Sequence, residues 1–90
     1  MVFPDLVALK KITGSTTIST VPAGGSKKAT ITLNTAYLII GVPKVSTSTE
    51  NAEVEVVNGG KNTFTVKAIN NGASDTDVAV SYEVYVLKEA

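Results

Sequence analysis

The ninety-residue sequence contains no cysteine, histidine, arginine or tryptophan. Without cysteine and histidine, the chain has no disulfide bond, thiolate nucleophile, imidazole base or usual zinc ligand. Without arginine, it has none of the bidentate side chains that read phosphates and guanine edges. We therefore expect a protein that is not an enzyme, uses no cofactor and does not bind nucleic acid.

Long hydrophobic runs are also missing. The longest apolar run, residues 37–42, is far shorter than the roughly 20 residues that a membrane-spanning helix requires. Residues 1–6 do not combine a basic region with an apolar stretch of signal-peptide length. We therefore expect neither a signal peptide nor a transmembrane segment, and no membrane partner.

Charge of either sign is scarce, because eight lysines balance eight acids in a chain that is 43% hydrophobic. A domain of this size buries only about 60–65% of its unfolded surface, so its own core leaves it a narrow margin of stability. Contact with further subunits would cover more of that surface. Self-assembly is therefore expected from size alone.

The residues that are abundant favour β-structure. Valine, isoleucine and threonine supply about a third of the chain, and β-branched side chains suit a pleated, half-buried surface. Apolar and polar residues alternate in several short segments, separated by Gly, Asn and Pro turns at 22–26, 58–61 and 70–75. We expect strands over residues 16–21, 28–34, 37–42, 44–49, 52–57, 63–68 and 78–86.

Short strands at intervals of about ten residues predict an antiparallel sandwich, because a parallel sheet would need crossover helices. The fold class is therefore all-β, a small antiparallel β-sandwich of about six to seven strands. Residues 14–90 form its single domain, and residues 1–13 form an N-terminal arm or edge segment. Residues 5–11 could form a short helix or an edge strand.

The apolar run 37–42 is the first candidate for an interface. A continuously apolar segment that ends at Pro43 suits a strand covered on both sides, by the second sheet or by a neighbouring subunit. Tyr82 belongs to the valine-rich face of the last strand, whereas Tyr85 either packs within the sheet or contacts a subunit or ligand. The predicted interface residues are Tyr37, Leu38, Ile39, Ile40 and Tyr85.

Two groups of polar residues are candidates for ligand binding. Acidic residues at Glu50, Glu53 and Glu55, and at Asp75 and Asp77, could in principle bind calcium. Their alternation with valines and their position in a loop favour solvated surfaces instead, so we expect no metal site. Residues of the loop between the strands expected over 63–68 and 78–86 could contact a polar ligand such as a sugar, and these are Asn70, Asn71 and Asp75.

Five short motifs carry a resemblance to a known class, and they lie at Gly14–Ile18, Val21–Gly25, Gly41–Val45, Thr63–Val66 and Val80–Val84. In their order they resemble small six-stranded sandwich modules of phage tails, fibres and capsid decoration proteins, including modules related in shape to the H-type lectins. The resemblance implies a non-enzymatic virion structural protein at the particle surface or tail, often a trimer or hexamer, that meets other virion proteins or a host-surface glycan. H-type lectins commonly hold sugar with histidine or arginine, which this chain lacks, so no site residue is carried over.

Two other functions stay open. The sandwich, immunoglobulin-like or H-type-lectin-like, could be a carbohydrate- or receptor-binding module that uses Tyr85, Asn70, Asn71 and Asp75. It could also be an accessory immunoglobulin-like domain of a larger cell-surface or secreted assembly. In each case unpaired edge strands need protection. We expect residues 1–11 to add to a neighbour or to fold over an edge.

Overall fold

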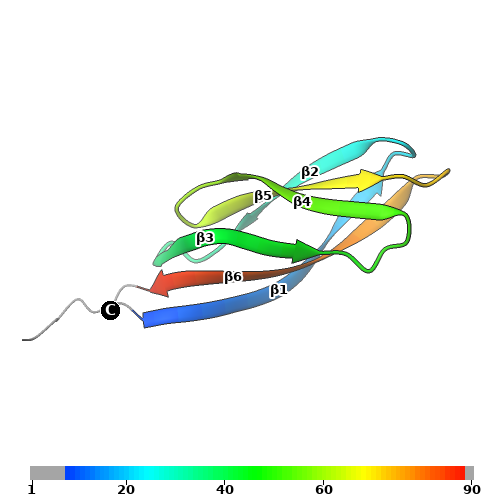
Figure 1. The fold of residues 1–90 in the computed structure, drawn as a ribbon. Helices are drawn as coiled ribbons and strands as arrows, with labels where there is room; N and C mark the ends of the chain where they lie inside the picture. The colour runs from blue at the N-terminus through cyan, green and yellow to red at the C-terminus, as the bar shows by residue number, and fades with distance from the viewer. Residues whose placement is uncertain (1–7, 89–90) are drawn as a thin grey trace, which may run out of the picture.

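The computed structural model describes residues 8–88, in which the regular structure is entirely β. The six strands are β1 (Ala8–Val21), β2 (Ser26–Thr32), β3 (Tyr37–Ser46), β4 (Ala52–Gly59), β5 (Thr63–Asn70) and β6 (Thr76–Lys88). All pairings are antiparallel. Sheet A has the order β1-β6-β3 and sheet B the order β2-β5-β4 (Figure 1). The expected small antiparallel β-sandwich is confirmed.

The three strands of sheet A face the three strands of sheet B. This arrangement differs from the four-plus-three strands of an immunoglobulin constant domain.

No helix that could span a membrane occurs within residues 8–88.

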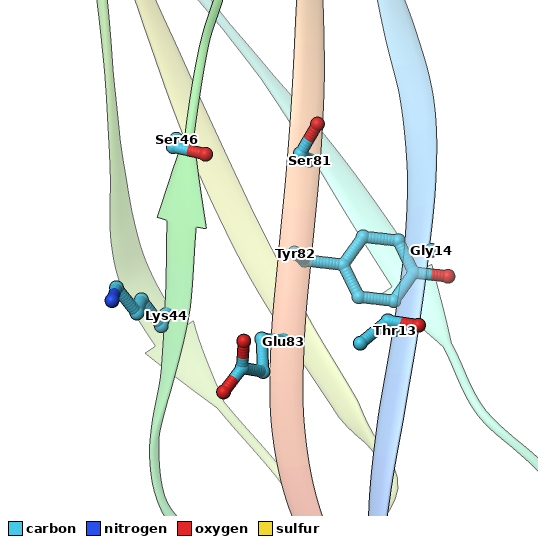
Figure 2. Close-up of a pocket in the computed structure, with 7 residues that line it drawn as sticks. All are labelled: Thr13, Gly14, Lys44, Ser46, Ser81, Tyr82 and Glu83. Carbon is cyan, nitrogen blue, oxygen red and sulfur yellow. The ribbon is translucent and has the colours of Figure 1, made fainter.

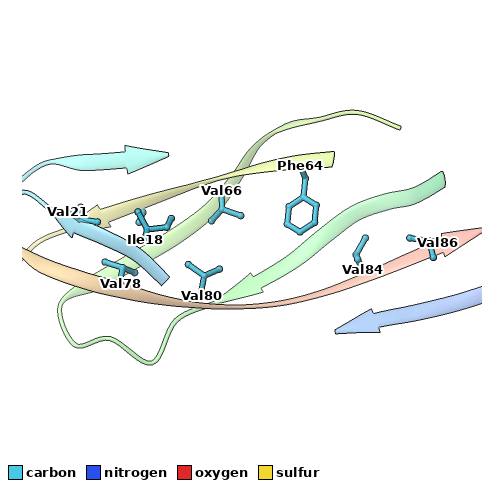
Figure 3. Packing of buried hydrophobic residues seen from close by; sticks show 9 residues of the cluster. Ile18, Val21, Phe64, Val66, Val78, Val80, Val84 and Val86 are labelled. Atoms are coloured by element: carbon cyan, nitrogen blue, oxygen red, sulfur yellow. The ribbon is translucent and has the colours of Figure 1, made fainter. Parts of the chain in front are cut away.

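The core lies between the two central strands, β5 and β6. Inward and outward side chains alternate along both strands, and most of the inward ones are almost completely buried. Valine dominates because its branched side chain packs well on a pleated face. The end of β1 completes the core (Figure 3). Its nine residues are Ile18, Val21, Phe64, Val66, Ala68, Val78, Val80, Val84 and Val86.

The molecule is long and narrow, with extents of 60 × 18 × 16 Å. Its radius of gyration is 15.5 Å, whereas a compact domain of this length has about 12 Å. The first and last described residues, Ala8 and Lys88, pair with each other, so both lie at one end. The turns at 22–25, 47–51 and 71–75 lie at the other end, which we call the loop end (Figure 1).

β1 is longer than the sequence predicted. The strand expected from residue 16 begins at Ala8 and pairs with β6 in unbroken register to Ile18. The helical option for residues 5–11 is therefore wrong for residues 8–11, and residues 5–7 lie outside the described part. β1 crosses the expected boundary between residues 13 and 14, so residues 8–13 are an edge strand of the sandwich. The part of the predicted N-terminal arm at residues 1–7 also lies outside the described residues.

β3 joins two strands that the sequence kept apart, residues 37–42 and 44–49. It continues through Pro43 because the register with β6 shifts between Ile40 and Lys44, which inserts a bulge. Gly41 in this bulge has φ +74°, a conformation open to glycine and unfavourable for other residues. Pro43, also in the bulge, is buried. The bulge lets a strand with a proline continue along the edge of sheet A.

Candidate assembly surface

The outer face of sheet A is the face that points away from sheet B, and the register fixes which side chains share it. β6 has core valines on its inner face, so Ser81, Glu83, Tyr85 and Leu87 lie on the outer face. Residues directly opposite in an antiparallel pair lie on the same face. Each of these β6 residues therefore defines a row of three side chains across β1, β6 and β3.

Two rows at the end that holds Ala8 and Lys88 are mostly apolar. The first row is Leu9, Leu87 and Leu38, and the second is Lys11, Tyr85 and Ile40. Val42 follows in the β3 bulge. We call Leu9, Leu38, Ile40, Val42, Tyr85 and Leu87 the apolar surface.

The apolar surface is open to solvent. Leu9 is 65% exposed, Leu38 43%, Ile40 42%, Val42 83% and Tyr85 46%, and Leu87 is partly exposed. Together these side chains expose an apolar area on the order of 500 Å², near the upper end of the largest patch on a typical monomer, about 300–600 Å². Patches of this size often mark contact sites.

Sheet B provides a comparison within the same molecule. Its outer rows are mainly Thr, Lys and Glu, for example Lys28, Lys67 and Glu55, and the hydroxyls of Thr30 and Thr65 lie 3.2 Å apart. Its apolar residues are isolated, Ile69 on β5 and Val57 in a bulge of β4. Sheet B therefore has the outer face expected for contact with water, whereas one end of sheet A does not.

The rest of the outer face of sheet A is polar. The third row is Thr13, Glu83 and Lys44, and the fourth is Ser15, Ser81 and Ser46. All of these residues except Ser15 line a shallow, open hollow of about 360 Å³, together with Gly14 and Tyr82 (Figure 2). At the border with the apolar surface, the Lys11 ammonium lies 3.5 Å from the Glu83 carboxylate. An exposed ion pair of this kind contributes at most about 1 kcal/mol to stability.

The predicted interface residues divide between two faces. Leu38, Ile40 and Tyr85 lie together in the apolar surface. Tyr37 and Ile39 point inward, where they are partly buried against the core. The Tyr37 ring also lies 5.7 Å from the Lys10 ammonium, within the range of a cation–π contact. Within the single chain, sheet B covers only the inner side of residues 37–42, so the expected cover on the outer side would have to come from a neighbouring subunit.

The sequence did not identify Leu9 and Leu87 as surface residues, whereas Val42 lies in the predicted run 37–42. Leu87 could have been found, because it continues the spacing of Ser81, Glu83 and Tyr85 along the outer face of β6. Leu9 joins the surface only through its pairing with Leu87. That pairing joins segments 78 residues apart and has no local signal in the sequence.

The predicted ligand loop lies at the loop end, far from the apolar surface along the strands. Asn70 is only 1% exposed, and its side-chain amide is fully used. It donates to the carbonyls of Val21 (3.0 Å) and Ser74 (2.8 Å) and accepts from the Gly72 amide (2.8 Å). Asn70 therefore holds the loop end together and is not accessible to a ligand.

The other loop residues are exposed, but their side chains also have local partners. The Asn71 amide donates to Glu53 at 3.2 Å. Asp75 accepts from the Ala23 amide at 3.1 Å, and Asp77 accepts from the Thr20 amide at 2.8 Å. Asp77 thus ties the start of β6 to the end of β1, and Asp75 ties the 71–75 turn to the β1–β2 turn. Within residues 8–88, no three acids come close enough to hold a metal ion.

Comparison of the chain with protein-family models, with curated proteins and with solved structures gave no match.

Proposed function

We propose that this protein is a non-enzymatic structural component of a virus particle that acts through protein–protein assembly. It is proposed as a capsid decoration protein or a tail or fibre component, located at the particle surface or tail. The observation that carries the proposal is the apolar surface of sheet A. This surface gathers three leucines, an isoleucine, a valine and a tyrosine at one end of a sheet, and contiguous apolar patches of this size often mark contact sites.

The chemistry of the outer face supports assembly rather than catalysis. The apolar surface is built on three hydrogen-bonded strands, so their paired backbone is already ordered before a partner binds and less conformational entropy is lost on contact. Tyr85 lies at its centre, where aromatic residues commonly contribute most to binding. The partners proposed are further copies of the chain and other virion proteins. A homo-oligomer, with a trimer or hexamer favoured, is the form that the sequence resemblance implies.

Mass spectrometry of particles purified from cultures of the encoding organism tests this function. We expect the chain to be present in a fixed number of copies per particle, at a constant ratio to the major capsid or tail protein. The ratio should survive a high-salt wash, because an apolar contact is not screened by salt. A chain found in the cell extract and missing from washed particles would contradict the proposal.

The polar hollow beside the apolar surface supports a second candidate function, a carbohydrate- or receptor-binding module. Hydroxyls of Thr13, Ser46 and Ser81 line it together with the Glu83 carboxylate and the Lys44 ammonium (Figure 2). Hydroxyl, carboxylate and ammonium groups are suited to hydrogen bonding with a polyhydroxylated ligand. This site replaces Asn70 of the predicted loop, because Asn70 is buried.

A glycan array tests this candidate. Binding that is lost in Glu83→Gln and kept in Glu55→Gln, an exposed acid of sheet B, would place the sugar in the hollow. An array without a hit, with calcium present and absent, would leave assembly as the single function.

A further inference from the structure

We propose that the apolar surface of sheet A binds the same surface of a second copy of this chain through a two-fold contact. This inference rests on the proposed assembly function and names the partner that covers the surface.

The exposed area is the first argument for a second copy. A specific interface needs about 1,000 Å² of total buried surface. Two apolar surfaces, each on the order of 500 Å², reach this value by covering each other. A larger partner of a different kind is therefore not needed to reach this area. Side chains at the border of the apolar surface add to the contact.

Charge is the second argument. The whole chain carries a formal net charge of zero, with eight lysines and eight acids, so two copies do not repel each other as they approach. The border of the apolar surface also carries both signs. Lys11 and Lys44 lie near Glu83 on the outer face of sheet A. When the charges at its border are balanced, a surface can pack against its own copy without bringing two large charges of the same sign together.

The β3 edge of sheet A favours face-to-face contact over strand addition. The bulge at 41–43 interrupts this edge, and Pro43 has no N–H group to donate. The Ile39 amide already donates to the Lys61 carbonyl of the β4–β5 turn at 2.8 Å. A partner on the β3 side therefore meets side chains of the outer face rather than a free row of backbone groups.

The order of the rows decides between two ways of placing the surface against itself. A two-fold axis along the strands sets each row against its own copy, so Glu83 lies opposite Glu83 beside the contact. A two-fold axis across the strands sets the leucine row against the Tyr85 row. It places Leu38 opposite Ile40 of the second copy and keeps the two Glu83 carboxylates on opposite sides of the contact. Like charges directly opposite are destabilising, so the second arrangement is favoured.

The second arrangement also suits the remaining neighbours. Leu87 lies opposite Tyr85 of the second copy, and Leu9 lies opposite Lys11. The aliphatic stem of Lys11 can cover Leu9 while its ammonium stays at the border. A two-fold contact of this kind produces a dimer, or a hexamer in which two-fold and three-fold contacts combine, and it does not by itself produce a trimer.

Mixing of two charged variants tests the partner and the arrangement together, with mass measured by light scattering on a sizing column. Leu38→Lys and Ile40→Asp alone should each weaken association about 100-fold, because each places an unpaired charge in the contact. In the mixture, Lys at 38 of one copy faces Asp at 40 of the other, and association should recover at least about tenfold. Thr30→Asp, at an outward position on the β2 edge strand of sheet B, is the matched control and should associate like the wild type.

Each outcome has a distinct meaning. Recovery in the mixture supports the two-fold contact across the strands. Recovery with Leu38→Lys and Leu9→Asp instead overturns this arrangement in favour of the axis along the strands. A wild-type chain that stays monomeric, or that forms only trimers, overturns the contact between copies. In that case the chain could still be present in purified particles, so the proposed function is judged separately.

Discussion

The ring of Tyr82 lies over the backbone of Gly14, its cross-strand partner in sheet A, and occupies the space that a side chain on Gly14 would need (Figure 2). The same ring meets Phe64 of sheet B edge to face, with centroids 5.5 Å apart. Gly14 thus lets an aromatic side chain lie across sheet A and link the two sheets, a contact that glycine in a strand allows.

Replacement of Gly14 by alanine should destabilise the fold. The added methyl group overlaps the Tyr82 ring, and overpacking of this kind costs about 1–3 kcal/mol in the free energy of unfolding. Urea denaturation measures the cost. In a Tyr82→Leu background the same substitution should cost clearly less, because the obstructing ring is gone. Equal costs in both backgrounds would show that Tyr82 is not the cause.

Asn70 should be far more important for stability than its neighbour Asn71. The buried Asn70 amide makes three hydrogen bonds that tie β1 and the 71–75 turn to β5, whereas the exposed Asn71 amide contacts only Glu53. Asn70→Ala leaves the buried Val21 carbonyl and two partly buried backbone groups without these partners and should cost about 2–4 kcal/mol. Asn71→Ala should change stability by no more than about 0.5 kcal/mol. Similar melting temperatures for the two variants would contradict this role for Asn70.

The β3 bulge should require glycine at position 41 for its backbone conformation. No atoms lie within 4 Å of an added Cβ at Gly41 or Gly59, but only Gly41 has a positive φ. Gly41→Ala should therefore cost about 1 kcal/mol, while Gly59→Ala should be near neutral. Thermal unfolding of both variants checks this difference. If the two alanine variants unfold alike, the backbone of the bulge differs from the one described.

A charged substitution should lower the stability of the fold strongly at Ile39 and only slightly at the adjacent Ile40 of β3. Ile39 packs against the core, whereas Ile40 lies in the apolar surface. In dilute solution, Ile39→Asp should lower the free energy of unfolding by about 2 kcal/mol or more, because it places a carboxylate beside the core. The free energy of unfolding of Ile40→Asp should lie within about 1 kcal/mol of the wild-type value. Measurements at low protein concentration separate folding from association, and strong destabilisation by Ile40→Asp would assign that residue to the core.

Much of the fold could be predicted from the sequence, because alternation with a period of two is a local signal. β6 shows it from Val78 to Val86, and the turn expected at 58–61 separates β4 from β5, although β4 continues to Gly59 and the turn lies at 60–62. The first half of β1 lacks this signal. Lys10 and Lys11 are consecutive, and Lys10 faces inward near the open end of the sandwich, where its ammonium reaches Tyr37. Because the end of the sandwich is open to solvent, a lysine can occupy an inward position there. The first half of β1 therefore lacks the alternation of apolar and polar residues that would predict a strand.

The candidate site could be predicted only in part, for a related reason. The sequence alone predicts Leu38 and Ile40, because they lie in an apolar run. It also predicts Tyr85, because this tyrosine lies outside the valine-rich face of the last strand. Which members of the run face outward depends on the register with β6, and a shift of one residue would exchange Ile39 for Ile40. The register is fixed by long-range pairing and by the bulge at Gly41. The extent of the apolar surface therefore emerges only when the three strands lie side by side.

The absolute mass of the wild-type chain in solution, measured by light scattering over a wide range of protein concentration, tests the assembly surface most directly. We predict a mass that rises with concentration to an even number of subunits, that persists at high salt, and that falls to a folded monomer in Ile40→Asp. Thr65→Asp, at the centre of the outer face of sheet B, should keep the wild-type mass. A wild-type chain that is monomeric at every concentration, or an Ile40→Asp variant that associates as the wild type does, would contradict the role of sheet A as an assembly surface.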